Sequence, residues 1–357
     1  MRARDVPVWS GPMDPLPFLT DAPSIGGRMR VAPDDFRVEE IPAYLPTGDG
    51  EHLYVTFEKR DRTTQEAVQA IAAALEVDPR SAGWAGLKDR DAVTVQTASF
   101  QFGDAARAEA LDLPNLRVLR AARHRNKLKS GHSHGNAFEI RVRDCVDGAE
   151  AIAHTVRDAL VSHGVPNFYG TQRFGRGGDN AERARAWLTG GDRGPRDAFV
   201  RKMWASALQS ELFNRYVAQR LRDGLLGKYI DGDLAVRHPN DRPFAIEPSE
   251  ADALYASLAC SPTGPMFGPE MKLATGAAAE REAAVLRDSG LTLENFARAG
   301  SVALGTRRSV RIPVPDLRVE RAPATEGSTG TDLVFRFTLP AGGYATTLLR
   351  EFRRMDD

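Results

Sequence analysis

GLKDRDAVTVQ, residues 86–96, holds an acidic residue between two basic ones directly before an alternating apolar stretch. The alternation over 93–102 predicts a β-strand, so Asp89 is expected in a turn at its start. Neighbouring positive charges favour an ionised carboxylate. A fixed carboxylate of this kind suits a nucleophile or a general base. On spacing alone, a polar turn with its charges in water is the simpler interpretation.

The surrounding sequence mixes strand and helix patterns. Strand-type alternation recurs across the first half of the chain, at 37–40, 52–59, 116–121 and 137–142. Apolar residues at helical spacing predict one helix that begins after Thr63 or Thr64 and ends before Asp78-Pro79, and another at 149–162. This mixture indicates an α+β layer with an exposed sheet face.

The pattern changes after Gly164. Helices are predicted within 180–222, at 249–259, at 278–289 and at 292–299, separated by Pro- and Gly-rich stretches at 239–248 and 261–269. Strands return at 309–313 and 333–339, and a short helix at 346–352 follows. We therefore predict an aperiodic arm at 1–28, one domain built from 29–163 plus 314–357, and a second domain inserted at 164–313.

Composition narrows the class of protein. The 357 residues carry 48 Lys and Arg against 48 Asp and Glu, so the formal net charge is zero and a polybasic binder is excluded. Two cysteines are too few for a disulfide framework. No signal peptide and no apolar run long enough to span a membrane is recognisable. We expect a reduced, soluble, cytoplasmic globular protein.

One stretch of the sequence is strongly basic, although the chain as a whole has no net charge. Residues 117–129 contain four arginines and two lysines, and no acid occurs from 114 to 138. Such an excess suits phosphate contacts, although a solvated basic loop is the alternative. Asn136 and Phe138 follow and add an amide and a stacking surface. The pair His132 and His134 lacks nearby residues to complete a zinc shell, so a metal site is not expected.

Two further segments stand out. Residues 164–178, GVPNFYGTQRFGRGG, place Arg173 and Arg176 around an aromatic residue, and residues 340–351 place Tyr344 at a sharp turn into a helix that contains Arg350. The glycines at 175–178 lack the spacing of a dinucleotide-binding fingerprint. Phosphate-binding P-loop and serine-hydrolase strings are also absent from the sequence.

These segments, in this order, resemble the tRNA pseudouridine synthase D family. The family string Gly-x-Lys-Asp-x-x-Ala-x-Thr-x-Gln is complete from Gly86 to Gln96. The strings at 33–40 (P-x-D-F-x-V-x-E), 135–138 (G-N-x-F) and 166–175 (PNFYGTQRFG) also match, so the resemblance covers about 29–357. It implies a mixed-sheet pseudouridine synthase catalytic domain, a mostly helical inserted domain at 164–313 and a cleft between them.

The resemblance also implies roles for individual residues. Asp89 matches the catalytic aspartate, and Phe36, Asn136 and Tyr344 match positions that contact the target uridine. Four more residues match or adjoin motif positions and are expected to bind substrate: Lys88, Phe138, Arg173 and Arg350. We further expect an arginine to pair with Asp89 and hold it charged, and Arg350 is the choice.

The implied activity is isomerisation of uridine to pseudouridine in tRNA, at position 13 of the D arm, without cofactor or metal. The implied partner is tRNA, with no membrane and no obligate protein partner. Two alternatives remain open. One is a catalytically inactive RNA-binding protein of the same fold. The other is a carboxylate-based nucleoside hydrolase, for which Asp91, Glu39 or Glu40 would be the second acid.

Overall fold

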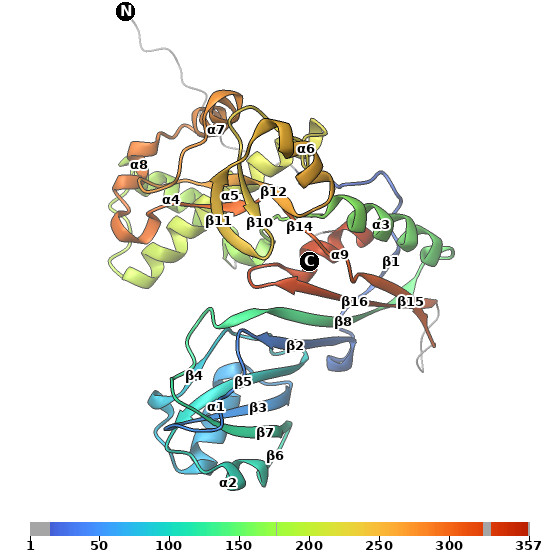
Figure 1. The fold of residues 1–357 in the computed structure, drawn as a ribbon, viewed down its shortest axis with the longest axis vertical. Helices are drawn as coiled ribbons and strands as arrows, with labels where there is room; N and C mark the ends of the chain where they lie inside the picture. The colour runs from blue at the N-terminus through green and yellow to red at the C-terminus, as the bar shows by residue number, and fades with distance from the viewer. Residues whose placement is uncertain (1–14, 176, 324–329, 356–357) are drawn as a thin grey trace, which may run out of the picture. The chain divides into compact units, whose positions relative to one another are not determined.

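The computed structural model describes residues 15–175, 177–323 and 330–355. The chain divides into two compact units (Figure 1). The sheet unit comprises residues 23–157 and 314–345, and the mixed unit comprises 1–22, 158–313 and 346–357. The helix α3 (Ala149–His163) contains the boundary at 157.

One mixed sheet dominates the sheet unit, in the order β15-β16-β8-β2-β5-β3-β7-β6, with β1 added beside β8 and β4 beside β5. The parallel pair is β2 with β5, whereas the other pairs are antiparallel. The strands are β1 (Gly26–Arg28), β2 (Phe36–Pro42), β3 (His52–Arg60), β4 (Gly83–Trp84), β5 (Val93–Gln101), β6 (Asp112–Leu113), β7 (Leu116–His124), β8 (Ser133–Cys145), β15 (Arg318–Ala322) and β16 (Thr331–Pro340). All strands predicted for this part of the chain are present, and β7 and β8 are longer than predicted.

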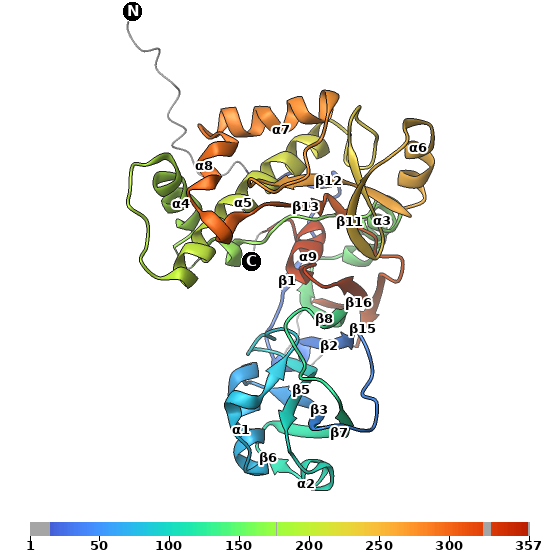
Figure 2. The same ribbon diagram turned by 60° about the vertical axis from the view of Figure 1, so that its left-hand side comes forward.

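The helix α1 (Thr64–Leu75) covers one face of β3 and β5 (Figure 2). Thr63 is its N-cap, and its side chain and that of Glu66 form a reciprocal capping box. The alternating residues Leu53, Val55 and Phe57 point to this face and are fully buried against α1. The short helices of the unit are α2 (Ala105–Glu109), η1 (Pro33–Asp35) and η2 (Pro79–Ser81).

The mixed unit combines helices with a four-stranded sheet, in the order β11-β10-β12-β13, and a two-stranded pair of β14 with β9. Its longest helix, α5 (Ala198–Arg222), packs against β12 and α7. The other elements are β9 (Val165–Pro166), η3 (Thr171–Phe174), α4 (Asn180–Thr189), β10 (Leu234–Arg237), β11 (Asn240–Ala245), α6 (Pro248–Ala256), β12 (Cys260–Met266), α7 (Gly276–Asp288), α8 (Leu293–Ala297), η4 (Gly300–Ala303), β13 (Thr306–Ser309), β14 (Arg311–Ile312) and α9 (Ala345–Arg353).

The four-stranded sheet corrects the prediction that Pro- and Gly-rich stretches merely separate helices. β11 and β12 occupy those stretches, and every residue of β12 is buried. Gly264 explains why this composition suits a buried strand. A Cβ atom built at Gly264 would lie 2.9 Å from ring atoms of Phe213 and Tyr216, so only glycine lets α5 approach this closely.

The N-terminal segment is more ordered than the predicted arm. Within the described part of 1–28, β1 pairs with β8, and Ile25 is fully buried. The Leu19 N–H donates a hydrogen bond to Glu351 Oε2 at 2.8 Å, so residues 19 and 351 meet within the mixed unit. The compact units therefore differ from the predicted domains at both ends, because 15–22 and most of α9 group with the inserted residues. Within the described ranges, no helix is both long enough and apolar enough to cross a membrane.

Candidate active site

Asp89 lies in the turn between β4 and β5, and hydrogen bonds fix that turn. Lys59 Nζ, from β3, donates to the Asp89 backbone oxygen at 2.6 Å. The Lys88 N–H donates to Thr64 Oγ1 at 2.9 Å, and Thr64 Oγ1 donates to Gln96 Oε1 at 3.0 Å. The Gly86–Gln96 string is thereby anchored on the first turn of α1. The Asp89 side chain stays 53% exposed, which leaves its carboxylate open to a ligand.

Lys59 continues the alternation of Leu53, Val55 and Phe57, so its side chain enters the same buried face. Burial lowers its pKa to about 8, and the nearby charge of Asp89 opposes that shift. The sequence holds a signal for this buried cation: Lys59 occupies the next inward-facing position of the strand after Leu53, Val55 and Phe57.

Arg30 is the arginine that pairs with Asp89, with Nη2 2.9 Å from Oδ2. The structure thus shows Arg30, and not the expected Arg350, as a partner of Asp89. The Arg30 guanidinium also lies over the ring of Phe36, with Cζ 4.4 Å from its centroid. Arg30 has a φ of 56°, which turns the chain sharply after β1. Phe36 is 3% exposed, and a base can stack on the ring face that Arg30 covers only after Arg30 moves.

The short helix η1 carries the chain from Arg30 to Phe36, and a buried ion pair secures it. The Asp35 carboxylate accepts hydrogen bonds from Arg143 Nη2 at 2.7 Å and from the Ala32 N–H at 2.8 Å. Asp35 is buried, and Arg143 belongs to β8. The geometry of this corner therefore depends on a charge pair between η1 and the sheet.

A second polar cluster joins Lys88, Glu40 and Asn136. Glu40 and Asn136 are cross-strand neighbours in β2 and β8, so their side chains share one face. Lys88 Nζ lies 3.2 Å from Glu40 Oε2 and donates to Asn136 Oδ1 at 2.6 Å. Because an ammonium group only donates, Lys88 must meet the amide oxygen of Asn136. The NH₂ group of Asn136 is thus available to donate to a ligand.

Aromatic side chains continue this face across β8 and β16. Val38, Phe138 and Phe337 lie side by side in the sheet register. Phe138 stacks on Phe337 with ring centroids 5.2 Å apart and meets the edge of Phe36 at 6.4 Å. Phe138 therefore lies beside Phe36. Asn136 is two residues away from Phe138 on the same face of β8.

Tyr344 follows the end of β16, at the predicted turn into α9. The Gly343 N–H donates to the Pro340 oxygen at 3.0 Å, and Gly342 has a φ of 84°, which confirms the sharp turn. Pro340 pairs with Gly135, the residue before Asn136. Tyr344 lies four residues after Pro340 in the sequence, and its side chain is partly buried.

Arg173 and Arg350 belong to the mixed unit. Arg173 Nε donates to Ser210 Oγ at 3.3 Å, and Arg173 also contacts Ser206 and the ring of Tyr169. Arg350 is buried, donates to the backbone oxygen of Pro17 at 3.2 Å and lies over the ring of Phe18. Arg350 thus holds the N-terminal segment against α9.

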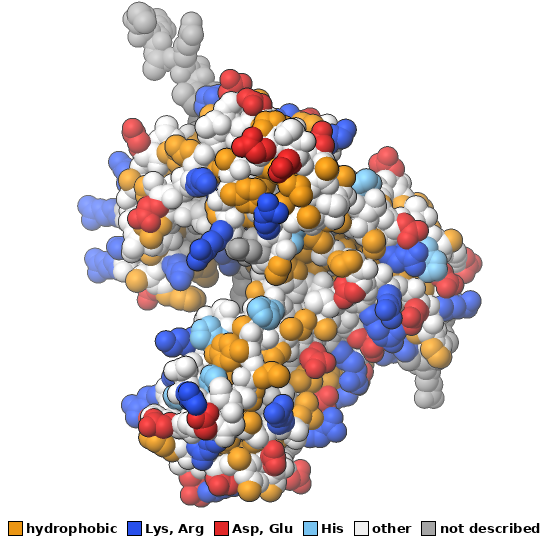
Figure 3. Space-filling view, in the orientation of Figure 1, with side chains coloured by type: hydrophobic (Ala, Val, Ile, Leu, Met, Phe, Trp, Pro, Cys, Tyr) orange, Lys and Arg blue, Asp and Glu red, His pale blue; other side chains and the backbone are white. Residues whose placement is uncertain are grey.

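The basic stretch is a strand, not a loop, as far as His124. Arg117, Arg120 and Arg123 are partly or fully exposed along β7, and Arg125 pairs with Asp49 at 2.8 Å. In the space-filling view, Lys and Arg side chains gather with His and hydrophobic side chains on the sheet unit (Figure 3). Arg176, named with Arg173 in the sequence, lies outside the described residues.

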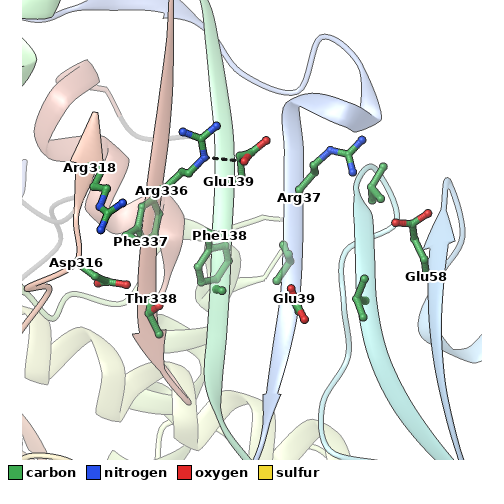
Figure 4. Close-up of a pocket in the computed structure, with 14 residues that line it drawn as sticks. Arg37, Glu39, Glu58, Phe138, Glu139, Asp316, Arg318, Arg336, Phe337 and Thr338 are labelled. Carbon is green, nitrogen blue, oxygen red and sulfur yellow. Dashed lines mark hydrogen bonds and ion pairs between the residues drawn. The ribbon is translucent and has the colours of Figure 1, made fainter. Parts of the chain in front are cut away.

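A wide depression over β2, β8 and β16 does not share this basic character. It has a volume of 510 Å³ and is lined by charged side chains of both signs (Figure 4). Arg336 Nε pairs with Glu139 at 2.7 Å, and four acidic side chains face three arginines. The charges are therefore balanced, which does not favour phosphate groups.

His124 and His132 make hydrogen bonds with protein groups. His132 Nδ1 lies 2.6 Å from the Tyr44 hydroxyl, and His124 Nδ1 accepts from the Thr47 N–H at 3.3 Å. Within the described part of the chain, no group of three or more His, Cys, Asp or Glu side chains is placed to hold a metal ion.

Comparison with known proteins identifies the family. The family model described as tRNA pseudouridine synthase D matches residues 13–188 and 197–352. The chain belongs to this family. It is 45% identical over 351 residues to the tRNA pseudouridine synthase D of Anaeromyxobacter dehalogenans strain 2CP-1, covering 96% of this chain and 97% of that protein. The tRNA pseudouridine synthase D of Thermus thermophilus is 42% identical, over 95% of this chain and 92% of its own.

A solved structure supports the same assignment. The crystal structure described as a tRNA pseudouridine synthase D of Methanosarcina mazei matches with a TM-score of 0.82 and 25% identity, over 95% of this chain and 96% of that one. The fold is accordingly the α+β pseudouridine synthase fold, and the protein is an isomerase that converts uridine to pseudouridine in tRNA.

Proposed function

We propose that this enzyme modifies uridine 13 in the D arm of tRNA, with Asp89 as nucleophile and without cofactor or metal. The reaction breaks the bond between N1 and C1′ and joins C5 to C1′. No atom or electron enters or leaves, so no redox group is required. The observation that carries the proposal is the exposed Asp89 carboxylate on a rigid turn, paired with Arg30 and close to a buried base-binding face.

The target base must leave the RNA stack to reach Asp89, at a cost of a few kcal/mol. Aromatic and amide groups in the protein offset that cost. Phe36 and Phe138 offer ring surfaces, Tyr344 a further aromatic side chain, and the NH₂ group of Asn136 a donor to a uracil carbonyl oxygen. For Phe36 to stack, the Arg30 guanidinium moves off its ring while the base enters.

Asp89 supplies one oxygen that bonds either to the sugar C1′ or to the pyrimidine ring while the glycosidic bond is open. The detached uracil then turns so that C5 faces C1′. C5 joins C1′ and the bond to Asp89 breaks; C5 loses its proton to solvent and N1 takes one up, so the isomerisation balances. Because the Asp89 side chain is half exposed in the protein alone, the RNA itself must cover the site and exclude water during this step.

Arginines and lysines along β7 and the segment that follows it, together with Arg173, would hold the RNA backbone. Their attraction is local, because the formal net charge of the chain is zero. The partner is a folded tRNA, and the proposal requires neither a membrane nor a second protein. A cytoplasmic location follows from that substrate.

The hydrolase alternative is less well supported. A carboxylate-based hydrolase needs a second acid near the first. Glu40 is paired with Lys88, Glu39 points to the opposite face of β2, and Asp91 is exposed. The intact Asp89 turn, with its hydrogen bonds to Lys59 and Thr64, also argues against an inactive binder.

The test uses EDTA-treated protein and unmodified tRNA transcripts, with pseudouridine mapped by carbodiimide-dependent primer extension. The proposal predicts one stop at position 13 and no free uracil. A stop elsewhere would refute the position, and loss of activity with EDTA that returns with a metal would refute the metal-free mechanism. Release of uracil would assign a hydrolase instead.

A further inference from the structure

Large apolar side chains are exposed at the start of α5, in the mixed unit. Phe199 is 75% exposed, more than any other large apolar side chain in the described ranges, and Met203 is 39% exposed. These residues lie four positions apart, so they share one side of the helix. The connection from α4 to α5 projects from the body of the unit (Figure 2). We call residues 193–204 the α5 tip. A single exposed ring is ordinary on a protein surface, so its surroundings decide what it can bind.

Local hydrogen bonds hold this ring in its exposed position. The Asp197 carboxylate accepts a hydrogen bond from the Val200 N–H at 3.0 Å and so caps α5. Arg201 Nε donates to the Pro195 backbone oxygen at 2.6 Å, which ties the connection to the first turn of the helix. Phe199 therefore belongs to a capped turn and not to a frayed end. A partner meets a ring whose backbone is already in place, which lowers the cost of binding.

Cations surround the ring without counter-charges. The α5 tip carries four exposed cationic side chains, and none of them forms an ion pair with a residue that the structure describes. They are Arg193, Arg196, Arg201 and Lys202. The two acids within 190–204, Asp192 and Asp197, each accept a hydrogen bond from a backbone N–H. The α5 tip is thus locally positive in a chain of zero net charge, which favours a polyanion.

RNA fits this surface better than a second protein. The core of a protein–protein contact is wider than one ring and one thioether side chain, and charged residues are depleted there. An unpaired base needs only one aromatic face, and its phosphates need cations nearby. The enzyme already handles such a ligand, because its substrate is tRNA. Arg193 and Arg196 lie between the two ranges that the family model matches, so they add to the motifs of the Asp89 site rather than repeat them.

We propose that the α5 tip binds the substrate tRNA, with Phe199 stacked on one unpaired base other than the target and with Arg193 and Arg196 at neighbouring phosphates. The inference rests on the proposed function, because it needs a folded tRNA on the enzyme. Stacking of one base on an aromatic side chain strengthens binding by roughly 5- to 100-fold. Each phosphate contact adds about 0.7–0.9 to the slope of log affinity against log salt concentration.

The first test separates stacking from simple apolar contact. The dissociation constant for a tRNA transcript is measured with Asp89→Asn protein, so that no reaction intervenes. Phe199→Leu should weaken binding by about 5- to 100-fold, whereas Phe199→Trp, which keeps an aromatic face, should bind within about twofold of the parent. Phe102→Leu is the matched control, because Phe102 is 69% exposed but lies after β5 in the sheet unit. It should also stay within about twofold.

The second test concerns the cations. The double variant Arg193→Gln/Arg196→Gln should reduce the salt slope by about 1.4–1.8, and Phe199→Leu should leave that slope unchanged because it removes no charge. Arg287→Gln is the control, since Arg287 is an exposed arginine on α7 in the same unit. It should keep the slope of the parent.

Three results would overturn the proposal. Phe199→Leu could bind tRNA as tightly as the parent, or Phe199→Trp could weaken binding as much as Phe199→Leu does. The double arginine variant could keep the parent's salt slope. A change in oligomeric mass of Phe199→Leu with unchanged tRNA affinity would assign the α5 tip to a protein contact instead.

These binding measurements are independent of the proposed reaction. If wild-type protein forms no pseudouridine at position 13 but the variants change tRNA affinity as expected, the proposed function fails and the contact at the α5 tip stands. If pseudouridine forms at position 13 and the variants bind tRNA as the parent does, the contact at the α5 tip alone fails.

Discussion

Replacement of Lys88 by methionine separates two contributions of this side chain, one to stability and one to catalysis. Lys88 and Glu40 side chains are 9% and 3% exposed, and their charges lie 3.2 Å apart. At an effective dielectric constant of about 20, this pair attracts by roughly 5 kcal/mol. Loss of one partner leaves Glu40 buried without a counter-charge. We therefore expect Lys88→Met to lower the free energy of unfolding by about 3–5 kcal/mol.

The second contribution is the orientation of Asn136. Without Lys88 as donor to its oxygen, the Asn136 amide is free to turn, and its NH₂ group no longer points reliably to the base. One misplaced hydrogen bond costs about 1–3 kcal/mol, so kcat/KM should fall by roughly 5- to 100-fold.

The double variant Lys88→Met/Glu40→Gln distinguishes these effects, with urea unfolding for stability and pseudouridine formation for activity. Removal of both charges should restore most of the lost stability, to within about 1 kcal/mol of wild type. Activity should stay low, because Asn136 remains unoriented. If the double variant recovered activity along with stability, or if Lys88→Met were as stable as wild type, the reasoning from this cluster would be refuted.

Other predictions concern the supports of the Asp89 turn. Burial lowers the pKa of Lys59 to about 8 in the folded protein, from its ordinary value of 10.5. Between these two pH values the unfolded chain keeps a proton on Lys59 that the folded protein has lost, so the free energy of unfolding rises as the pH rises from about 8 to 10.5. Urea unfolding at about pH 7.5 and 9.5 should show that rise in wild type and not in Lys59→Met; equal changes in both would contradict it. Arg30→Met should lower kcat/KM at least about tenfold. It should change the free energy of unfolding by less than about 1 kcal/mol, because the Arg30–Asp89 pair is partly exposed. Single-turnover assays and thermal unfolding measure the two effects, and unchanged activity would count against the pairing. Asp35→Ala should destabilise the protein by about 3–5 kcal/mol, because it removes the buried carboxylate that Arg143 contacts, and Asp35→Ala with Arg143→Met should recover most of that loss. Additive losses of the two single variants in chemical denaturation would disprove the pair.

Much of the sheet unit was predictable because local signals agree with tertiary burial. The alternation of Leu53, Val55 and Phe57 and the cap at Thr63 predict β3 and α1, and the structure confirms both. The mixed unit was harder. Burial against α5 permits β12 in spite of its prolines and glycine, and that information lies in Phe213 and Tyr216, far away in the sequence.

The candidate site shows the same limit. Asp89, Lys88 and Asn136 were found from their motif strings, but motif strings do not say which side chains meet. Arg30, at a position with left-handed backbone, is the partner of Asp89, whereas Arg350 lies against the N-terminal segment of its own unit. Glu40 is recognisable in a motif string, yet its pairing with Lys88 depends on the register between β2 and β8.

The most direct test of the central claim compares Asp89→Asn with Asp91→Asn in single-turnover reactions on tRNA. Both carboxylates are exposed in the same turn, but Asp89 alone is paired with Arg30 beside Phe36. Asp89→Asn should bind tRNA within a few-fold of wild type and form pseudouridine at least about a thousandfold more slowly, whereas Asp91→Asn should stay within about threefold of wild type. Pseudouridine formed by Asp89→Asn at a rate near that of wild type would contradict the account.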